Sequence, residues 1–312
     1  MLTRQPNFKA YLALSAVCFF WGTTYLGIRM ALDSFTPALL IGTRYTISGS
    51  IMVAAAVLTK ARLPRGCELW LTALYGAMIL GLGSGAIALT ETWIPTGLAA
   101  LFVTASPFWL VGADALFPGG ERLHPPVIAG LLVGLAGTIL LVSQSAARAP
   151  SGKSIITGFL ILQVGCAGWG AGSILHRRLR ATVHSVVRGG VEQLGAGVAF
   201  TILAAFTEGF HARWTVRGMG ALVYLIIAGS IVGYSAYAYA LDRLPVSLLS
   251  IYTYINPIVA VFLGWLFYRE AFGLREALAM LVIFVGVAIV KRHAGHGSGP
   301  LTPEDVREPS LV

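Results

Sequence analysis

The sequence predicts an all-α polytopic membrane protein with ten transmembrane helices, arranged as two inverted five-helix repeats. Three observations lead to this prediction: the apolar composition, the division of the chain into apolar segments, and a match between its two halves. Hydrophobic residues make up 56% of the 312 residues and charged residues only 11%, whereas a soluble domain carries roughly 25% charged residues. A chain this apolar cannot cover itself with a polar surface, so we expect lipid to be its solvent.

Ten apolar segments follow one another along the chain, and each has about the length that a transmembrane helix needs, roughly 20 residues. They lie at approximately 10–31, 37–59, 69–90, 95–116, 125–143, 155–176, 185–206, 219–241, 245–267 and 273–291. Polar residues flank this region. We expect residues 1–9 to form a cytoplasmic N-terminus and residues 292–312, rich in Gly and Pro, to form a disordered cytoplasmic tail.

Lys and Arg residues are spread unevenly over the connections between these segments. The chain carries a net charge of +9, and with a cytoplasmic N-terminus the cytoplasmic connections hold about twice as many Lys and Arg residues as the others. We therefore expect both termini in the cytoplasm and a multi-pass location in the cell (inner or plasma) membrane. No nucleic-acid-binding motif accompanies the basic residues, so the lipid bilayer, and not nucleic acid, is the expected partner.

The two halves of the chain resemble each other. The motif "CFFWG" at 18–22 matches "CAGWG" at 166–170, and Gly, Pro, Arg and Glu residues match further on at offsets of 148 to 150. The repeats span residues 10–143 and 155–291. Because each holds five spans, an odd number, the two must enter the membrane from opposite sides. Inverted repeats are typical of secondary transporters, with the solute site near the bilayer midplane between the halves. A duplication without a transport role is the alternative.

Longer motifs occur at equivalent places in both halves. The first half carries "WGTTYLGIRMALDSFTPALLIGTRYTISG" and "PTGLAALFVTASPFW", followed by "GERL" and "GLAGTILL"; the second carries "PVSLLSIYTYINPIVAVFLGWLFYREA" and "FVGVAIV". These motifs resemble EamA-domain proteins of the drug/metabolite transporter superfamily over residues 10–291. The resemblance implies a ten-helix bundle that exports metabolites or amino-acid-like solutes. The four-helix multidrug members carry a membrane-embedded Glu in their first helix, but "LALSAVCFFWGTTYLG" holds no acid, so their proton exchange does not transfer.

Ionisable residues inside the predicted spans need a reason, since each costs roughly 2.5–3.5 kcal/mol at a helix centre. Arg44 and Glu192 are related by the repeat offset of 148, so we expect them at matching depths, as an ion pair or as two poles of one cavity. A purely structural ion pair is the alternative. Glu91 resembles an acid in EamA relatives ("TETWIP"), with snorkelling to the interface as an equal alternative. Asp114 is expected to be a solvated charge at a helix end.

Aromatic and weakly polar residues on the predicted helices suit the wall of a solute cavity. Besides Arg44 and Glu192, the predicted substrate-binding residues are Trp21, Thr24, Tyr25, Trp169, Tyr237, Tyr252 and Asn256. Trp21 and Trp169 are repeat-related, and each precedes a Gly that allows close helix approach. Asn256 precedes Pro257, and the loosened turn is tolerated at that depth only against protein or a water-filled cavity. An interfacial aromatic belt is the alternative for the Tyr and Trp residues.

These observations predict a transporter of small organic solutes, with a channel-like facilitator or uniporter as the main alternative and an intramembrane enzyme as a weaker one. The sequence holds no HExxH, GxSxG or P-loop motif, and we expect neither a metal nor a cofactor. His176 and His184 are placed in a basic inner loop. A monomer is sufficient for this function, and the sequence leaves the oligomeric state open.

A proton gradient is the expected driving force if the flux is coupled to an ion. Burial disfavours the charged form of a carboxyl group, so Glu192, deep in its span, is the expected proton-bearing residue. Glu91 is the second candidate, but a position nearer the outer water would keep it ionised.

Overall fold

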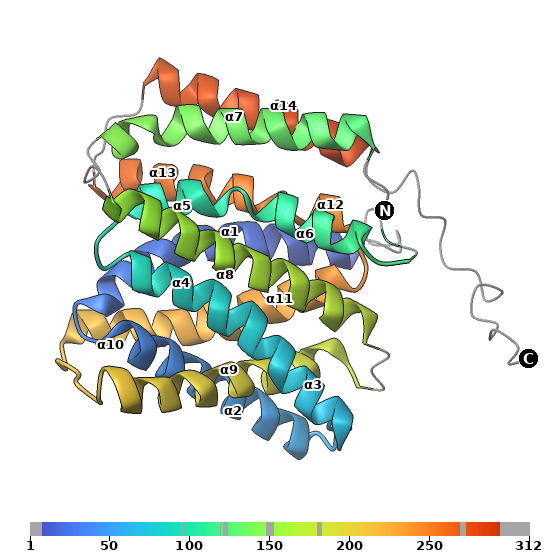
Figure 1. Cartoon of the computed structure of the whole chain (residues 1–312), viewed down its shortest axis with the longest axis vertical. Helices are drawn as coiled ribbons and strands as arrows, with labels where there is room; N and C mark the ends of the chain where they lie inside the picture. Colours follow the sequence, from blue (N-terminus) through green and yellow to red (C-terminus); the bar gives the residue numbers. More distant parts are fainter. Residues whose placement is uncertain are drawn as a thin grey trace, which may run out of the picture.

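The computed structural model describes residues 8–94, 96–118, 120, 124–147, 153–179, 183–268 and 273–293. Over these residues the regular elements are helices, and extended pairing is limited to an isolated bridge between Phe35 and Ala212. The long helices run side by side in one bundle (Figure 1). The predicted all-α class is confirmed.

Six of the predicted spans are helices long and apolar enough to cross a membrane. They are α1 (Phe8–Leu32), α2 (Pro37–Leu58), the continuous run α3 (Cys67–Gly76), η2 (Ala77–Leu82) and α4 (Gly83–Thr90), then α8 (Lys153–Arg178), α9 (Ser185–Thr207), and the continuous run α10 (Val216–Tyr224), η3 (Leu225–Val232) and α11 (Gly233–Leu241). Pro37 is the first residue of α2. Proline is favoured there because an N–H in the first helical turn would have no partner within the helix, so its absence costs nothing.

The other four predicted spans form the remaining helices. They are α5 (Thr96–Val103) with α6 (Ser106–Ala115), α7 (Pro125–Ala147), α12 (Val246–Leu249) with α13 (Tyr252–Tyr268), and α14 (Leu274–His293). The apolar stretches described there, Ala99–Ala115, Pro125–Leu140 and Val246–Val259, are shorter than a full span. The ten-span layout therefore stays a prediction.

Two predicted spans, 95–116 and 245–267, are each interrupted by a turn, and the local sequence explains both. Helix α5 ends at Val103. In a continuous helix the residue four positions on would donate to the Val103 carbonyl, but that residue is Pro107, which has no N–H. Between α12 and α13, the Ser250 hydroxyl donates to the Ser247 carbonyl, and the Thr253 hydroxyl donates to the Ser250 carbonyl. Such local side-chain bonds compete with the regular helix ladder.

Two π-helical stretches, η2 and η3, lie within the long third and eighth predicted spans. Each ends directly before a glycine, Gly83 or Gly233, that begins the next α-helix. These glycines are related by the repeat offset of 150. π-Helical turns are frequently found at functional sites. The matching positions of η2 and η3 therefore make the helices around them candidates for the functional site.

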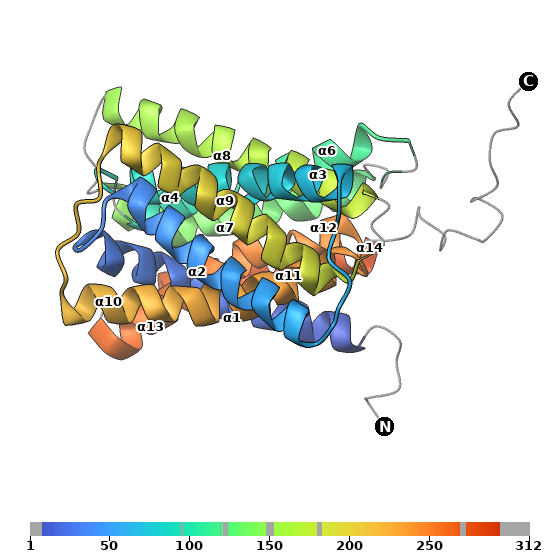
Figure 2. The same cartoon turned by 90° about the horizontal axis from the view of Figure 1, so that it is seen from below.

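Helix contacts follow a pattern that stays the same when the two halves are exchanged. Helix α2 packs on α9, as Figures 1 and 2 show, and α7 packs on α14, as Figure 1 shows. Helix α1 packs on η3, α11 and α13, while its counterpart α8 packs on η2, α4 and α6. Each of these contacts joins a helix of the first half to a helix of the second. The interior of the bundle therefore lies between the two halves.

Glycines bring α2 and α9 into close contact. A Cβ atom on Gly49 would lie 2.5 Å from the Leu194 backbone nitrogen, and one on Gly197 would lie 2.2 Å from the Thr46 backbone nitrogen. Real Cβ atoms do not approach this closely, so both positions require glycine. The tight crossing holds Arg44 on α2 and Glu192 on α9 in the bundle interior, where they are 4% and 1% exposed.

Candidate functional site

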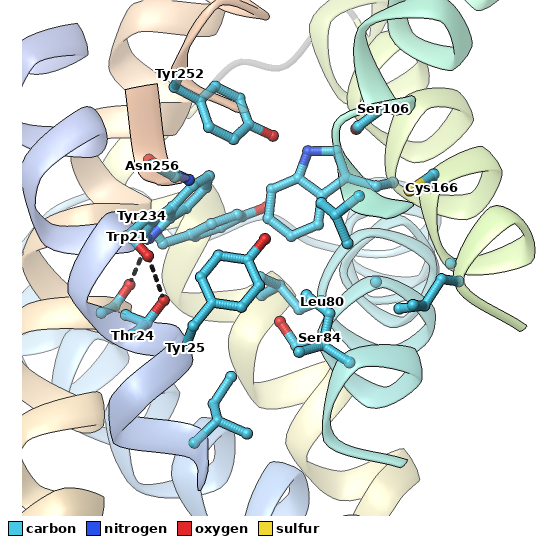
Figure 3. A pocket seen from close by; sticks show the side chains of 18 of the residues that line it. Trp21, Thr24, Tyr25, Leu80, Ser84, Ser106, Cys166, Tyr234, Tyr252 and Asn256 are labelled. Atoms are coloured by element: carbon cyan, nitrogen blue, oxygen red, sulfur yellow. Dashed lines mark hydrogen bonds between the residues drawn. The ribbon is translucent and has the colours of Figure 1, made fainter. Parts of the chain in front are cut away.

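A cavity of about 70 Å³ lies between the two halves of the chain (Figure 3). Its polar and aromatic lining residues are Trp21, Thr24, Tyr25, Arg44, Tyr45, Ser84, Ser106, Cys166, Trp169, Tyr234, Tyr252 and Asn256. Aliphatic side chains such as Ile28 and Leu80 complete the wall. A water molecule needs about 10–15 Å³ of such space, so the cavity has room for several waters or a small organic group.

Most of the residues predicted from the sequence meet at this cavity. Trp21, Thr24, Tyr25, Arg44, Trp169, Tyr252 and Asn256 line it. Tyr237 and Glu192 lie behind the wall. The Tyr237 hydroxyl accepts a hydrogen bond from Trp169 Nε1 at 3.0 Å and lies 2.8 Å from Ser173 Oγ, so Tyr237 holds a lining residue in place.

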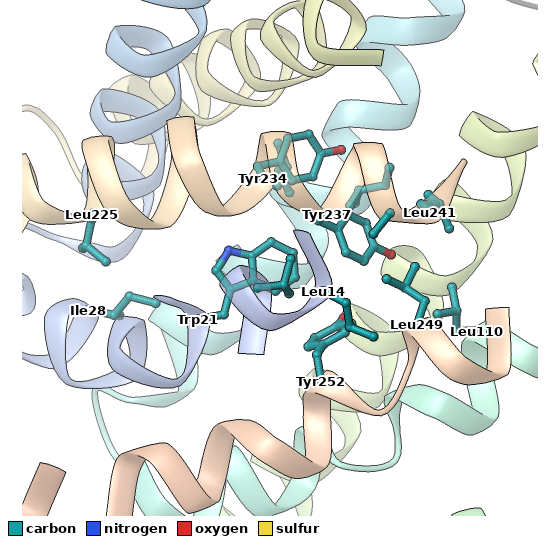
Figure 4. Packing of buried hydrophobic residues seen from close by; sticks show 14 of the residues in the cluster. Leu14, Trp21, Ile28, Leu110, Leu225, Tyr234, Tyr237, Leu241, Leu249 and Tyr252 are labelled. Carbon is teal, nitrogen blue, oxygen red and sulfur yellow. The ribbon is translucent and has the colours of Figure 1, made fainter. Parts of the chain in front are cut away.

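Four aromatic rings pack together beside the cavity, and Figure 4 shows three of them, Trp21, Tyr237 and Tyr252. The Trp21 ring lies 5.2 Å from Trp169, 5.0 Å from Tyr237 and 5.2 Å from Tyr252, measured between ring centroids. Edge-to-face geometry, seen in the contacts with Trp169 and Tyr252, is the favoured arrangement for such pairs. The Trp21 Nε1 also donates to the Gly229 carbonyl in η3 at 3.0 Å. The rings are therefore fixed in orientation.

The two repeat-related tryptophans sit on the two repeat-related glycines of the opposite half. A Cβ atom on Gly233 would lie 2.6 Å from Trp21 Nε1, and one on Gly83 would lie 2.5 Å from Trp169 Cε3. Each indole thus packs where a π-stretch gives way to an α-helix. Glycine is required there because any side chain would displace the ring.

Arg44 places a buried positive charge in the cavity wall. Its Nε donates to Ser230 Oγ at 2.7 Å, and its guanidinium carbon lies 4.8 Å from the centroid of the Tyr45 ring. Among the described residues, the ion pairs involve other cations, and no acid lies within ion-pair distance of Arg44. A buried cation without an acidic partner is costly, and a bound anion would reduce that cost.

The expected contact between Arg44 and Glu192 is not formed. Glu192 instead accepts a hydrogen bond from the Tyr234 hydroxyl at 2.8 Å and contacts His176 Nδ1 through its other oxygen. The repeat places both charges in the interior, as expected, but η3 lies next to α2 and offers Ser230 to Arg44. Of the two arrangements considered, the direct ion pair is absent in this conformation.

The placement of His176 in an inner loop was wrong. Helix α8 continues to Arg178, so His176 lies in its last turn, 1% exposed and directed at α9. The Arg188 Nη1 donates to the His176 carbonyl at 2.8 Å. His184, by contrast, precedes α9 and caps it, accepting from the Val186 backbone N–H at 3.3 Å.

Glu91 is buried and does not reach the interface by snorkelling. It follows α4, is 0% exposed, and its carbonyl accepts from Arg29 Nη1 at 2.6 Å. Within the described residues neither of its carboxyl oxygens has a hydrogen-bond partner. Glu91 begins the turn formed by residues 91–94, and its burial there is not revealed by the sequence.

Asp114 is also not the solvated charge that was expected. It is 5% exposed and forms an ion pair with Arg178, with Arg178 Nη2 lying 2.9 Å from Asp114 Oδ1. Helix α6 packs on α8, which brings the C-terminal ends of the two helices together and covers the carboxylate.

Comparison with known families supplies the class of protein. The EamA-like transporter family model matches this chain twice, over residues 8–143 and 156–292. The chain belongs to the EamA-like transporter family.

Relatives of this EamA-like transporter are named as transporters. The chain is 32% identical over 280 residues to "Uncharacterized inner membrane transporter YedA" of Escherichia coli, covering 89% of each chain. It is 27% identical over 265 residues to "Probable terminal-alkyne amino-acid exporter" of Streptantibioticus cattleyicolor, covering 84% of this chain and 86% of the relative. It is 24% identical to "Probable amino-acid metabolite efflux pump" of Escherichia coli, covering 86% and 90%.

A solved crystal structure shares the fold of this EamA-like transporter. It superposes with a TM-score of 0.78 at 24% identity and covers 91% of this chain and 97% of its own. The family and the named relatives establish a multi-pass membrane transporter and set aside the intramembrane enzyme.

Several lining residues of this EamA-like transporter were not predicted from the sequence. Tyr45, Ser84, Ser106 and Cys166 line the cavity, and Tyr45 and Ser84 lie within hydrogen-bond distance, with their hydroxyl oxygens 2.7 Å apart. Tyr45 follows Arg44 directly, and Ser84 follows the repeat-related Gly83, so both stand next to residues that the repeat singles out. Tyr234, in contrast, could be predicted as a wall residue because it shares a helix face with Tyr237 at i, i+3, and it does line the cavity.

Proposed function

We propose that this chain is a secondary transporter, acting as an exporter, that moves small organic solutes such as amino acids or amphipathic metabolites by alternating access. The observation that carries the proposal is the cavity between the halves, with a cation that has no acidic partner among the described residues in a wall of aromatic, aliphatic and weakly polar side chains. Two relatives are named as amino-acid exporters or efflux pumps, which supports both the solute class and the direction.

The architecture proposed for this cycle is ten spans in two inverted repeats of five. Its support is the exchange symmetry of the helix contacts, the two π-stretches, and the reciprocal packing of Trp21 on Gly233 and Trp169 on Gly83. The family model also matches the chain once in each half. With equivalent contacts in both halves, rocking one half against the other exchanges two similar arrangements around the same cavity.

Arg44 defines the chemistry of the solute. A guanidinium group binds a carboxylate through paired charge-assisted hydrogen bonds. The surrounding rings of Trp21, Trp169, Tyr25 and Tyr252 suit an apolar or aromatic body. A solute with a carboxylate at one end and an apolar side chain at the other fits both features, and large apolar amino acids have this form.

Counterflow separates a carrier from a channel-like facilitator. Purified protein is reconstituted into liposomes loaded with unlabelled phenylalanine, and uptake of labelled phenylalanine is followed. A carrier is expected to take up label faster when unlabelled solute is present inside, because the loaded protein returns for another cycle. A channel would show no such stimulation. Uptake equal to that of protein-free liposomes, for phenylalanine and for a panel of other amino acids, would refute the proposed solute class.

The proposed orientation places both termini in the cytoplasm of the inner membrane. Cys67, exposed at the start of α3, would then face the cytoplasm, whereas Trp214, 75% exposed after α9, would face outward. In intact cells a membrane-impermeant thiol reagent is expected to label Trp214→Cys but to leave Cys67 unlabelled until lysis. The wild-type chain, with Cys67 as an internal reporter, is the control. Labelling of Cys67 in intact cells would contradict the orientation.

A further inference from the structure

Four charged or titratable side chains form a cluster that joins α8, α9 and α11 near their ends. The charge cluster consists of His176, Arg188, Glu192 and Asp242. His176 Nδ1 contacts Glu192 Oε1, and Arg188 Nη2 donates to Asp242 Oδ2 at 3.1 Å. Three of the four residues are at most 5% exposed, whereas the Asp242 side chain is 24% exposed. The cluster is therefore buried and reaches water at one member.

The charges of the cluster balance only when it holds one additional proton. With neutral His176, the sum is one positive charge from Arg188 and two negative charges from Glu192 and Asp242, which leaves a net charge of −1. One proton on His176 or on Glu192 brings the sum to zero. Uncompensated charge is strongly disfavoured in a buried site, and Asp242 is the member of the cluster whose charge water can screen.

The His176 ring shows where that proton can enter. Its Nε2 has no hydrogen-bond partner among the described residues, although it is buried, and it lies 3.8 Å from Asp242 Oδ1. A protonated Nε2 directed at a carboxylate is favourable, whereas a bare nitrogen lone pair there is repelled. Asp242 is the exposed member of the cluster, so it connects this nitrogen to water.

Tyr234 connects the cluster to the solute cavity. Its hydroxyl donates to Glu192 Oε2 at 2.8 Å, and its side chain lines the cavity. The contacts thus run from the cavity through Tyr234, Glu192 and His176 to Asp242 at the water-exposed end. Arg44, in contrast, lines the cavity and hydrogen-bonds to Ser230, which is not a member of this series.

Other groups face the cluster from the helices packed around it. Tyr237 on α11 interacts electrostatically with Glu192, and Tyr45 on α2 interacts with Tyr234. From α3, Gly76 packs against the backbone of Glu192, where a Cβ atom would lie 2.1 Å from the Glu192 carbonyl oxygen. The described parts of α2 and α3 add no ion pair to the cluster.

We propose that His176 and Glu192 together bind one exchangeable proton, which passes between water and the cavity side through Asp242. In one access state the proton is taken up from water at His176 Nε2, beside Asp242, while the proton on Nδ1 moves to Glu192 Oε1. Release reverses both transfers, but in the access state open to the other side of the membrane. Tyr234 then meets either a carboxylate or a neutral acid, and its side chain transmits the difference to the cavity. This site rests on the proposed transport function and supplies its coupling ion.

Infrared difference spectroscopy tests proton binding without the need for a known solute. The full chain in lipid vesicles is titrated between about pH 5 and pH 8, the range in which a histidine-containing site exchanges protons. A carboxyl band that changes with pH is expected in the wild type. It should vanish in Glu192→Gln and change its midpoint in His176→Gln. The variant Asp114→Asn, which alters a separate buried ion pair with Arg178, is the matched control and should keep the band.

The same variants are then compared in phenylalanine flux driven by a pH gradient. Coupling to one proton changes the equilibrium accumulation ratio of the solute about tenfold per pH unit of gradient. This dependence should disappear in Glu192→Gln while counterflow persists. Circular dichroism and gel filtration confirm that each variant is folded.

The two readouts separate the two proposals. A pH-independent wild-type spectrum, or a carboxyl band retained in Glu192→Gln, would overturn the proton site even if solute is transported. The expected infrared changes without flux of any solute would refute the transport function and leave the proton site standing. Loss of the band in Asp114→Asn as well would show a general structural effect and also overturn the assignment.

Discussion

Replacing Arg44 with Gln is expected to remove the preference of the cavity for solutes that carry a carboxylate. Arg44 has one protein hydrogen bond, to Ser230, and no acidic partner among the described residues. Losing a buried charge-assisted pair costs about 2–5 kcal/mol, which corresponds to roughly 30-fold weaker binding or more. The variant Arg44→Lys keeps the charge but lacks the forked geometry, so it should fall between Gln and the wild type.

The measurement compares two solutes that differ only in the group Arg44 would bind. Inhibition of counterflow is measured with phenylalanine and with phenylalaninamide, which has no carboxylate. The wild type should favour phenylalanine, and Arg44→Gln should bind both equally weakly. Arg62→Gln removes the same charge from an exposed loop position and serves as control. If Arg44→Gln still discriminates between the two solutes, Arg44 does not bind the carboxylate.

Exchanging the charges of Arg44 and Glu192 should not restore the folding or the flux that each single substitution impairs. The double variant Arg44→Glu with Glu192→Arg would place an acid beside Ser230 and a cation beside His176 and Tyr234, because these are the neighbours of the two positions. Restoration of folding and flux would show instead that the two residues do pair during transport.

Trp21→Ala is expected to cause the largest loss of stability among the cavity residues. The substitution removes three ring contacts and the hydrogen bond to the Gly229 carbonyl in η3. Truncation of a large buried aromatic side chain costs about 3–5 kcal/mol. Trp21→Phe keeps a ring but leaves the carbonyl without its donor, at a cost of about 1–3 kcal/mol. The predicted order of unfolding midpoints is therefore wild type, Phe, then Ala.

Thermal unfolding in detergent checks this order. Trp70→Ala provides the matched control because Trp70 is 76% exposed on α3, in contrast to Trp21 at 8%. It should leave the midpoint nearly unchanged. Equal losses in Trp21→Ala and Trp70→Ala would show that the aromatic group around Trp21 does not stabilise the interior.

The class of the fold and much of the cavity wall could be predicted because both depend on local patterns. Apolar segment length locates helices, and the repeat offset singled out Trp21 with Trp169 and Arg44 with Glu192. The π-stretches could not be predicted, since an apolar run such as "AMILGL" suits an α-helix equally well. They form where α4 and α11 must place Gly83 and Gly233 against an indole from the other half.

The partners of the buried charges could not be predicted because they depend on helix ends and on tertiary packing. The predicted span 155–176 ends at His176, and α8 continues to Arg178, so His176 lies in the last helical turn and not in the loop. The packing of α9 beside that turn brings Glu192 to His176. Likewise, Glu91 is buried by a turn of residues 91–94, and Asp114 by the packing of α6 on α8.

The unpaired charge of Arg44 has a consequence for the electrical behaviour of the transport cycle. An empty cavity carries the positive charge of Arg44 in its wall. A bound monoanionic solute brings the sum to zero, whereas a zwitterionic amino acid leaves it unchanged. Moving one elementary charge across the whole membrane against a potential of 100 mV requires about 2.3 kcal/mol. Voltage therefore acts on the empty protein and much less on one loaded with a monoanionic solute. Under an imposed potential, the rate of the empty return step should respond more strongly than exchange between two loaded states.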